Sequence, residues 1–167
     1  WRVDLRAQSW KREPVPESWS RLGGRGLSAR IPLDEVPPTC EPLGRYNKLV
    51  IAPGLIVGHM LTSCDRLSFG AKSPMTRGIK EANAGGSTGL HMTNLGMKAL
   101  ILEDQCPADG TAKSGWWVLH LSLAGARFEP ADDVAGLGVH EAAPRLLKRY
   151  GDKTAIALIG PAGEMQL

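Results

Sequence analysis

The residues best suited to bind an anion lie between positions 66 and 89. Residues 83–89 read NAGGSTG, and these glycines can take positive φ angles and bring main-chain amides close to a bulky ligand. Successive exposed amides in such a turn form a concavity that suits anions. Arg66 and Lys72 add nearby positive charge of the kind that a phosphate or another oxyanion prefers. The segment therefore predicts either an oxyanion site or a purely structural turn, and the residues alone leave both open.

No sequence motif names a nucleophile, a general base or a nucleotide site. GxGxxG, GxxxxGK[ST], HExxH, CxxC and GxSxG do not occur. The histidines are isolated from one another and from acidic residues at ligand spacing: His59, His91, His120 and His140. The cysteines are odd in number and far apart, which favours reduced thiols over disulfides or a four-cysteine metal site: Cys40, Cys64 and Cys106.

Composition predicts one domain in the cytoplasm that binds neither nucleic acid nor a membrane. With 167 residues, of which 43% are hydrophobic, the chain can bury one core. The net charge of +3 is small and the basic residues are scattered, so no nucleic-acid track is predicted. No apolar run approaches the roughly 18 residues of a membrane span, and no signal-peptide pattern begins the sequence.

Short strands and short helices must position these residues, as the 20 glycines and 12 prolines indicate. Apolar runs predict strands at residues 1–5, 48–52, 66–71, 98–102, 116–123, 125–128 and 154–159. Apolar spacing predicts helices at residues 17–22, 27–35, 90–95 and 139–150. Pro74 ends the strand at 66–71, and a loop is expected from there to Asn83. The glycines at 23–26 interrupt a helical pattern, either for close backbone packing or to let Arg25 contact an anion. The fold class is therefore α+β and rich in strands.

Several longer segments resemble the N-terminal domain of the aldehyde ferredoxin oxidoreductases, a family of tungsten-pterin enzymes. They are RVDL (2–5), LGGRGLSAR (22–30), EVPPTCEPLGRYNKLVIAPG (35–54), AKSPMTRGIKEANAGG (71–86), GLHMTNLGMKALILED (89–104) and AIALIGPAGE (155–164). Their order and spacing are similar to those of the family, and together they cover nearly the whole chain.

The resemblance implies two packed β-sheets that lie under a tungsten- or molybdenum-bis-pterin cofactor of the molybdopterin type. It assigns cofactor binding to Arg66, Asn83, Ala84, Gly85 and Gly86. It also implies that the main-chain carbonyl of Asn83 binds a magnesium ion that bridges the two pterin phosphates. A guanidinium and main-chain amides bind phosphate without a change of protonation, and a carbonyl is the hard oxygen ligand that magnesium prefers.

The resemblance further implies a role in oxidising aldehydes to carboxylic acids, with electrons passing through a 4Fe–4S cluster to ferredoxin. Residues 1–167 are then a single N-terminal cofactor-binding domain or small subunit. The cluster belongs to later helical domains that lie outside this sequence, so this chain is not expected to be catalytic alone. The expected partners are those domains or that subunit, ferredoxin through them, and a second copy if the enzyme is a homodimer.

Cys64 and Asp65 stand where the family usually has two glycines before the arginine. This departure favours an alternative in which the fold is kept as a non-catalytic interaction or scaffold module. A third hypothesis is an independent phosphate or nucleotide binder that uses residues 83–89.

Overall fold

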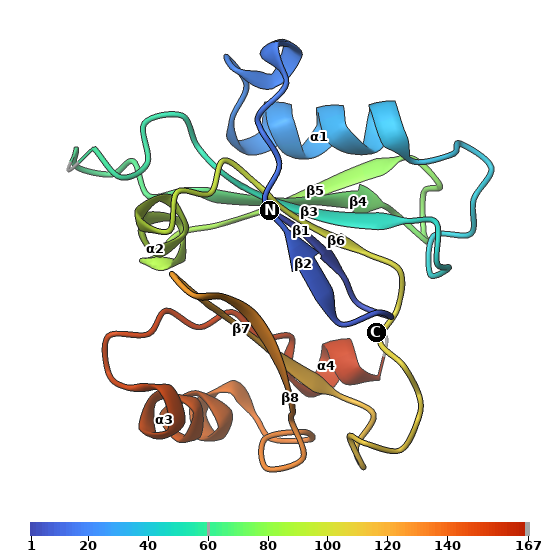
Figure 1. Ribbon diagram of the computed structural model, residues 1–167, viewed down its shortest axis with the longest axis vertical. Coiled ribbons are helices and arrows are strands. Elements are labelled where there is room, and N and C mark those ends of the chain that lie inside the picture. Colours follow the sequence, from blue (N-terminus) through green and yellow to red (C-terminus); the bar gives the residue numbers. More distant parts are fainter. Residues whose placement is uncertain (60, 166–167) are drawn as a thin grey trace. The chain divides into compact units, whose positions relative to one another are not determined.

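The structure, a computed structural model, describes residues 1–59 and 61–165 (Figure 1). Its elements are β1 (Arg2–Asp4), β2 (Ser9–Lys11), η1 (Glu17–Trp19), α1 (Gly24–Glu35), β3 (Lys48–Pro53), β4 (Leu67–Lys72), β5 (Ile79–Ala84), α2 (Thr88–Asn94), β6 (Leu100–Glu103), β7 (Trp117–Ser122), β8 (Gly125–Pro130), α3 (Val139–Tyr150) and α4 (Gly160–Glu164). The chain forms two compact units, residues 1–107 with 122–126 and residues 108–121 with 127–167. The expectation of a single domain over residues 1–167 stays a prediction.

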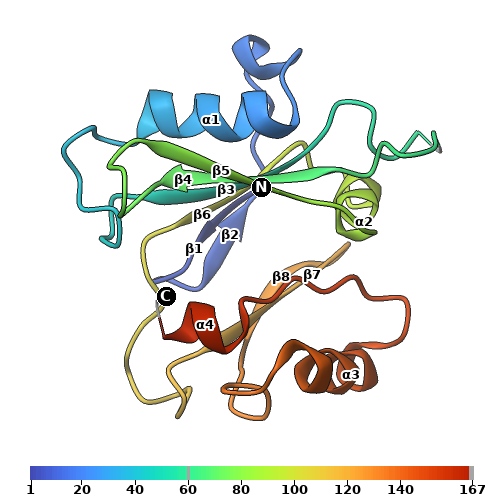
Figure 2. The same ribbon diagram turned by 180° about the vertical axis from the view of Figure 1, so that it is seen from behind.

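The first unit is built on a six-stranded sheet with the order β2-β1-β6-β3-β4-β5. Its β1 and β6 are parallel, and its other neighbouring strands are antiparallel. Figures 1 and 2 show α1 lying over one face of this sheet. Leu27 and Ile31, four residues apart on one side of α1, are fully buried and form one core cluster with Val50 and Ile101. Because burying each such side chain contributes about 1.5–3 kcal/mol, this contact holds α1 on the sheet.

The helix α1 begins earlier than the glycines at 23–26 suggest. It starts at Gly24, whose φ is +50°, whereas the sequence predicts a start at Leu27. A Cβ on Gly23 would lie 2.8 Å from the main-chain nitrogen of Leu55. Gly23 and Gly24 therefore lie close to the backbone after β3, which was one of the two expectations, whereas a Cβ on Gly26 would meet only the Leu22 side chain, at 3.8 Å. The helix continues through Gly24 and Gly26.

The strand β5 replaces most of the loop expected after Pro74. A turn at residues 73–78 reverses the chain, because the Ser73 hydroxyl accepts hydrogen bonds from the amides of Met75 and Thr76. The returning strand pairs antiparallel with β4, with Asn83 opposite Ser68. Asn83 and Ala84 thus belong to a strand, and the expectation of a glycine-rich loop from residue 83 onward is wrong for these two residues.

The second unit has a core formed by Ala131, Val134, Ala142 and Leu146, and it contains α3 and α4. The predicted strand at residues 154–159 is wrong, because these residues form no ladder within the described part of this unit. Ile156 and Leu158 instead pack against the core through their side chains. Their apolar alternation therefore reflects burial without strand pairing.

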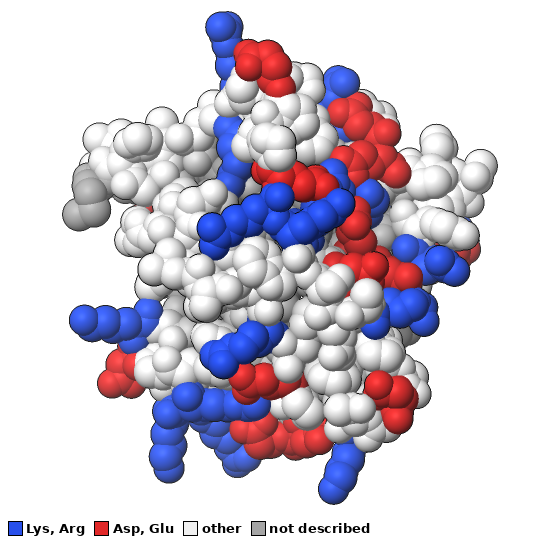
Figure 3. Space-filling model, in the orientation of Figure 1, with Lys and Arg blue, Asp and Glu red and all other residues white. Residues whose placement is uncertain are grey.

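A network of charged side chains joins α1 to three strands at the end of the helix opposite Gly24. Arg2 donates to Glu13, Glu35 and Glu103, and the ammonium of Lys48 lies 2.6 Å from Glu35 and 2.7 Å from Glu103. Burial alone would raise the pKa of the Glu35 carboxyl, but hydrogen bonds from Arg2 and Lys48 lower it. Figure 3 shows basic and acidic side chains adjoining one another over much of the displayed face.

The α+β class with two sheets and short helices is confirmed. The second sheet is the hairpin formed by β7 and β8. The strands expected at 116–123 and 125–128 and the helix expected at 139–150 are found within a few residues of their predicted bounds. Within residues 1–59 and 61–165, no helix has the length and apolar character needed to cross a membrane.

Candidate functional site

Four segments of the first unit meet at one end of its sheet. The amide of Gly54, just after β3, donates to the carbonyl of Arg66, just before β4. Leu67 pairs with Ala84 at the end of β5, so Gly85, the next residue, lies at the same end of the sheet. A Cβ on Gly24, at the start of α1, would lie 3.6 Å from the Cα of Gly54. The fold therefore gathers the glycines before α1, after β3 and after β5 around Arg66.

The structure brings together the arginine and asparagine that the sequence selected. The Arg66 side chain is exposed, and its Nη1 donates to Oδ1 of Asn83 over 3.4 Å. A guanidinium has five N–H donors, and among the described residues this one uses a single donor on a protein side chain. The remaining donors can reach a phosphate or a carboxylate in front of the sheet end.

Gly85 and Gly86 form the open part of this site. Both are exposed, and within the described structure a Cβ on either residue would have no atom within 4 Å. The φ of Gly86 is +104°, a conformation that side-chain-bearing residues rarely adopt. Gly85 and Gly86 therefore lie on open surface, and the assignment of ligand binding to them stays a prediction.

Sequence reasoning missed Glu81 and Ser68, whose side chains accept hydrogen bonds from the amide of Asn83. The Nδ2 of Asn83 donates to Oγ of Ser68 over 3.0 Å and to Oε1 of Glu81 over 3.3 Å. Arg25, at the start of α1, donates from Nε to the other carboxylate oxygen of Glu81 over 3.1 Å. Hydrogen bonds from Ser68, Asn83 and Arg25 lower the pKa of the Glu81 carboxyl, with the Ser68 hydroxyl as the largest cause. The alternating pattern of β5 is the signal that could have placed residues 81 and 83 on one face.

Lys72 does not join this site, so its expected role beside Arg66 is wrong. It lies at the other end of β4 and is buried, with 7% of its surface exposed. Its ammonium donates to the main-chain carbonyls of Pro38 and Cys40, the latter over 2.7 Å. Lys72 therefore ties the loop after α1 to the sheet.

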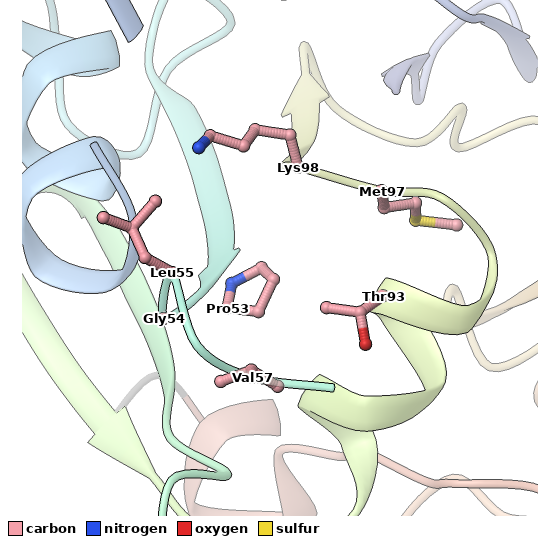
Figure 4. Close-up of a pocket in the computed structure, with 7 residues that line it drawn as sticks. All are labelled: Pro53, Gly54, Leu55, Val57, Thr93, Met97 and Lys98. Carbon is pink, nitrogen blue, oxygen red and sulfur yellow. The ribbon is translucent and has the colours of Figure 1, made fainter. Parts of the chain in front are cut away.

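A small hollow next to Gly54 is too small for an organic ligand. It has a volume of about 90 Å³ and is lined by Pro53, Gly54, Leu55, Val57, Thr93, Met97 and Lys98 (Figure 4). Ligand pockets usually enclose roughly 300–1,000 Å³. The described residues also contain no group of three His, Cys, Asp or Glu side chains that could hold a metal ion. The open surface at Arg66, Asn83, Gly85 and Gly86 is thus the better candidate for ligand binding.

Comparison with known proteins gives this arrangement a family context. Residues 1–167 match the family described as "Aldehyde ferredoxin oxidoreductase, N-terminal domain". The chain is 32% identical over 162 residues to a tungsten-containing aldehyde ferredoxin oxidoreductase of Pyrococcus furiosus, with 96% of this chain and 25% of that protein covered. It is 33% identical over 153 residues to the protein of the same name from Thermococcus kodakarensis, with 91% of this chain and 24% of that protein covered.

A solved structure has a similar fold. It is titled "Active site complex BamBC of Benzoyl Coenzyme A reductase in complex with 1,5 Dienoyl-CoA". The TM-score is 0.86 at 28% sequence identity, with 97% of this chain and 24% of that chain covered. The chain thus spans about a quarter of the length of each of these proteins.

Proposed function

Because the chain belongs to the aldehyde ferredoxin oxidoreductase family, which it matches through the N-terminal domain, we propose that it binds the cofactor of a tungsten-dependent oxidoreductase. The cofactor is a metal chelated by two pterins of the molybdopterin type, each with a phosphate. Tungsten is the metal in the names of the relatives, and molybdenum is the other metal that such pterins hold.

The observation that carries the proposal is the contact of Arg66 with Asn83 beside the open glycines. An exposed guanidinium and accessible main-chain amides offer several donors to one phosphate, and neither kind of donor loses its proton at neutral pH. Ala84, the last residue of β5, brings the chain to this edge. The residues present therefore fit an anionic, bulky group that approaches the end of the sheet.

In the proposed enzyme the bound metal and pterins supply the oxidation of an aldehyde to a carboxylic acid. Arg66 would hold a pterin phosphate, the main-chain N–H groups of Gly85 and Gly86 would donate hydrogen bonds to it, and the carbonyl of Asn83 would be a ligand of a magnesium ion. These residues bind and orient the group. They do not take part in proton transfer, because a guanidinium, a main-chain amide and a carbonyl do not change protonation when they bind a phosphate or a metal ion.

The rest of the enzyme is proposed to complete the site. Since the chain spans about a quarter of its relatives, the 4Fe–4S cluster, the transfer of electrons to ferredoxin and the substrate pocket are assigned to the other three quarters. We place this enzyme in the cytoplasm, where thiols such as Cys40 and Cys64 stay reduced. A homodimer is compatible with the proposal.

The proposal is tested on the proposed full-length enzyme, in which this chain is joined to, or assembled with, the remaining domains. Arg66→Ala and Asn83→Asp should each lower the tungsten and pterin content per polypeptide, measured by mass spectrometry of the metal and by fluorescence of the oxidised pterin. Arg77→Ala is the matched control, because Arg77 is also exposed and lies at the other end of the β4–β5 hairpin, where it pairs with Glu41. Unchanged cofactor content in both Arg66→Ala and Asn83→Asp would refute the proposal.

The likeness to the benzoyl coenzyme A reductase complex supports a second candidate, the reduction of an aromatic coenzyme A thioester. Both candidates would use this chain in the same way, because the match covers 97% of it. Assays of the full-length enzyme with an aldehyde and with benzoyl coenzyme A distinguish them. Turnover of the thioester alone would select the second candidate.

A further inference from the structure

Asn83 lies between two groups whose hydrogen-bonding roles are fixed. On one side Glu81 presents a carboxylate oxygen 3.3 Å from Nδ2, and on the other the Nη1 of Arg66 lies 3.4 Å from Oδ1. A carboxylate only accepts hydrogen bonds and a guanidinium only donates them. Asn83 must therefore turn its NH₂ group toward Glu81 and its oxygen toward Arg66. If the amide were flipped, its oxygen would face the carboxylate and its NH₂ group would face the guanidinium, and neither pair could form a hydrogen bond.

Ser68 extends this arrangement into the core. Its side chain is 1% exposed, and its Oγ accepts from Nδ2 of Asn83 over 3.0 Å. The same hydroxyl is the largest cause of the lowered pKa of the Glu81 carboxyl. The Glu81 side chain is only 14% exposed although most other residues of β5 are exposed, and Arg25 holds its second oxygen. Glu81 is thus held by Asn83 on one carboxylate oxygen and by Arg25 on the other.

We propose that Glu81, with Ser68, is a positioning residue for a phosphate of the cofactor. It fixes the orientation of the Asn83 side-chain amide, and the oxygen of that amide in turn holds the guanidinium of Arg66 in place. This inference rests on the proposed function, which assigns Arg66 and Asn83 to cofactor binding. Without Glu81, the amide of Asn83 can rotate, and Arg66 loses the acceptor that holds it at the end of the sheet. An exposed arginine that samples many rotamers then pays more conformational entropy when it binds an anion.

The direction of the effect separates positioning from simple electrostatics. A carboxylate near a phosphate repels it, so removal of Glu81 would strengthen phosphate binding if charge were its only influence. Positioning predicts the opposite, weaker binding. It also predicts a difference between Glu81→Ala and Glu81→Gln, which remove the same charge, because glutamine keeps an acceptor oxygen for Asn83 and alanine does not.

The experiment measures the rate at which the full-length protein loses tungsten and pterin at an elevated temperature. We expect release to be about three- to tenfold faster in Glu81→Ala, the effect of losing about one hydrogen bond, with Glu81→Gln between Glu81→Ala and the wild type. Glu41→Gln is the matched control, because it removes a carboxylate from the exposed pair with Arg77 and should leave the rate unchanged. In an Asn83→Ala background, Glu81→Ala should have no further effect.

Each result bears on one of the two proposals. The positioning role is overturned if both Glu81 variants release tungsten and pterin at the wild-type rate or more slowly. It is also overturned if Glu81→Ala speeds release as much in the Asn83→Ala background as in the wild type. If Arg66→Ala speeds release while the Glu81 variants do not, only this inference fails. If Arg66→Ala and Asn83→Asp both retain their cofactor, the proposed function fails, and the inference fails with it. The melting temperature of each variant shows whether its fold is intact. If a Glu81 variant does not fold, Ser68→Ala gives an independent test, because it is also expected to release the cofactor faster.

Discussion

Gly70→Ala should push α1 away from the sheet and destabilise the first unit. A Cβ at residue 70 would lie 2.3 Å from the carbonyl oxygen of Ser28 and 2.8 Å from its carbonyl carbon. Ordinary contacts between such atoms are about 3.5 Å long, so α1 has to move by about 1 Å. Since the opposing atoms are main chain, no change of side-chain rotamer can relieve the contact.

The cost of this displacement follows from what α1 buries. Leu27 and Ile31 are fully buried in the layer that would open. Overpacking of a close-packed interior costs about 1–3 kcal/mol, and we expect the upper end, about 3 kcal/mol, because rigid backbone lies on both sides. For a chain of this size that corresponds to a melting temperature lower by about 6–12 °C.

Thermal unfolding followed by circular dichroism measures this effect, and Gly85→Ala is the control. A Cβ at residue 85 meets no described atom within 4 Å, so that variant should stay within about 0.5 kcal/mol of the wild type. Equal melting temperatures for the two variants would refute the packing of α1 on β4 described above.

Two further predictions concern the charged groups of the first unit. The lowered pKa of Glu35 adds stability that is present above the unfolded-state pKa of about 4.3 and is lost as the pH falls through the lower folded-state value. Glu35→Gln should therefore cost about 1 kcal/mol near neutral pH and nothing in strong acid, and urea unfolding at several pH values would contradict this if the difference stayed constant. Lys72→Met should cost about 2 kcal/mol, because the carbonyls of Pro38 and of the buried Cys40 lose their donor. Its tungsten content should match the wild type, and a loss of tungsten would place Lys72 in the site after all.

The sequence predicts the fold class and half of the site for a physical reason. Apolar alternation reports burial on one face of a strand, so β3, β4 and the β7–β8 hairpin could be located from it. The same signal fails at Ile156 and Leu158, which are partly buried by side-chain packing alone. Burial and strand pairing give the same apolar alternation in a sequence. Whether a ladder forms depends on partner strands that the local pattern does not specify.

Arg66 and Asn83 could be selected because their types suit phosphate and they stand near glycines. Ser68 and Glu81 could not be selected as partners of Asn83 from the sequence, because they become its neighbours only through the register of β4 and β5. That register is set by the turn at residues 73–78, which sequence reasoning treated as the start of a longer loop. Arg25 is even more remote, since it reaches Glu81 only after α1 packs across the sheet.

A density map of the full-length protein, isolated with its cofactor, tests the central claim most directly. We predict phosphate oxygens within hydrogen-bonding distance of the Arg66 guanidinium and of the amides of Gly85 and Gly86, with the nitrogen of the Asn83 side chain turned toward Glu81. A cofactor whose phosphates lie elsewhere, with Arg66 extended into solvent, would contradict it.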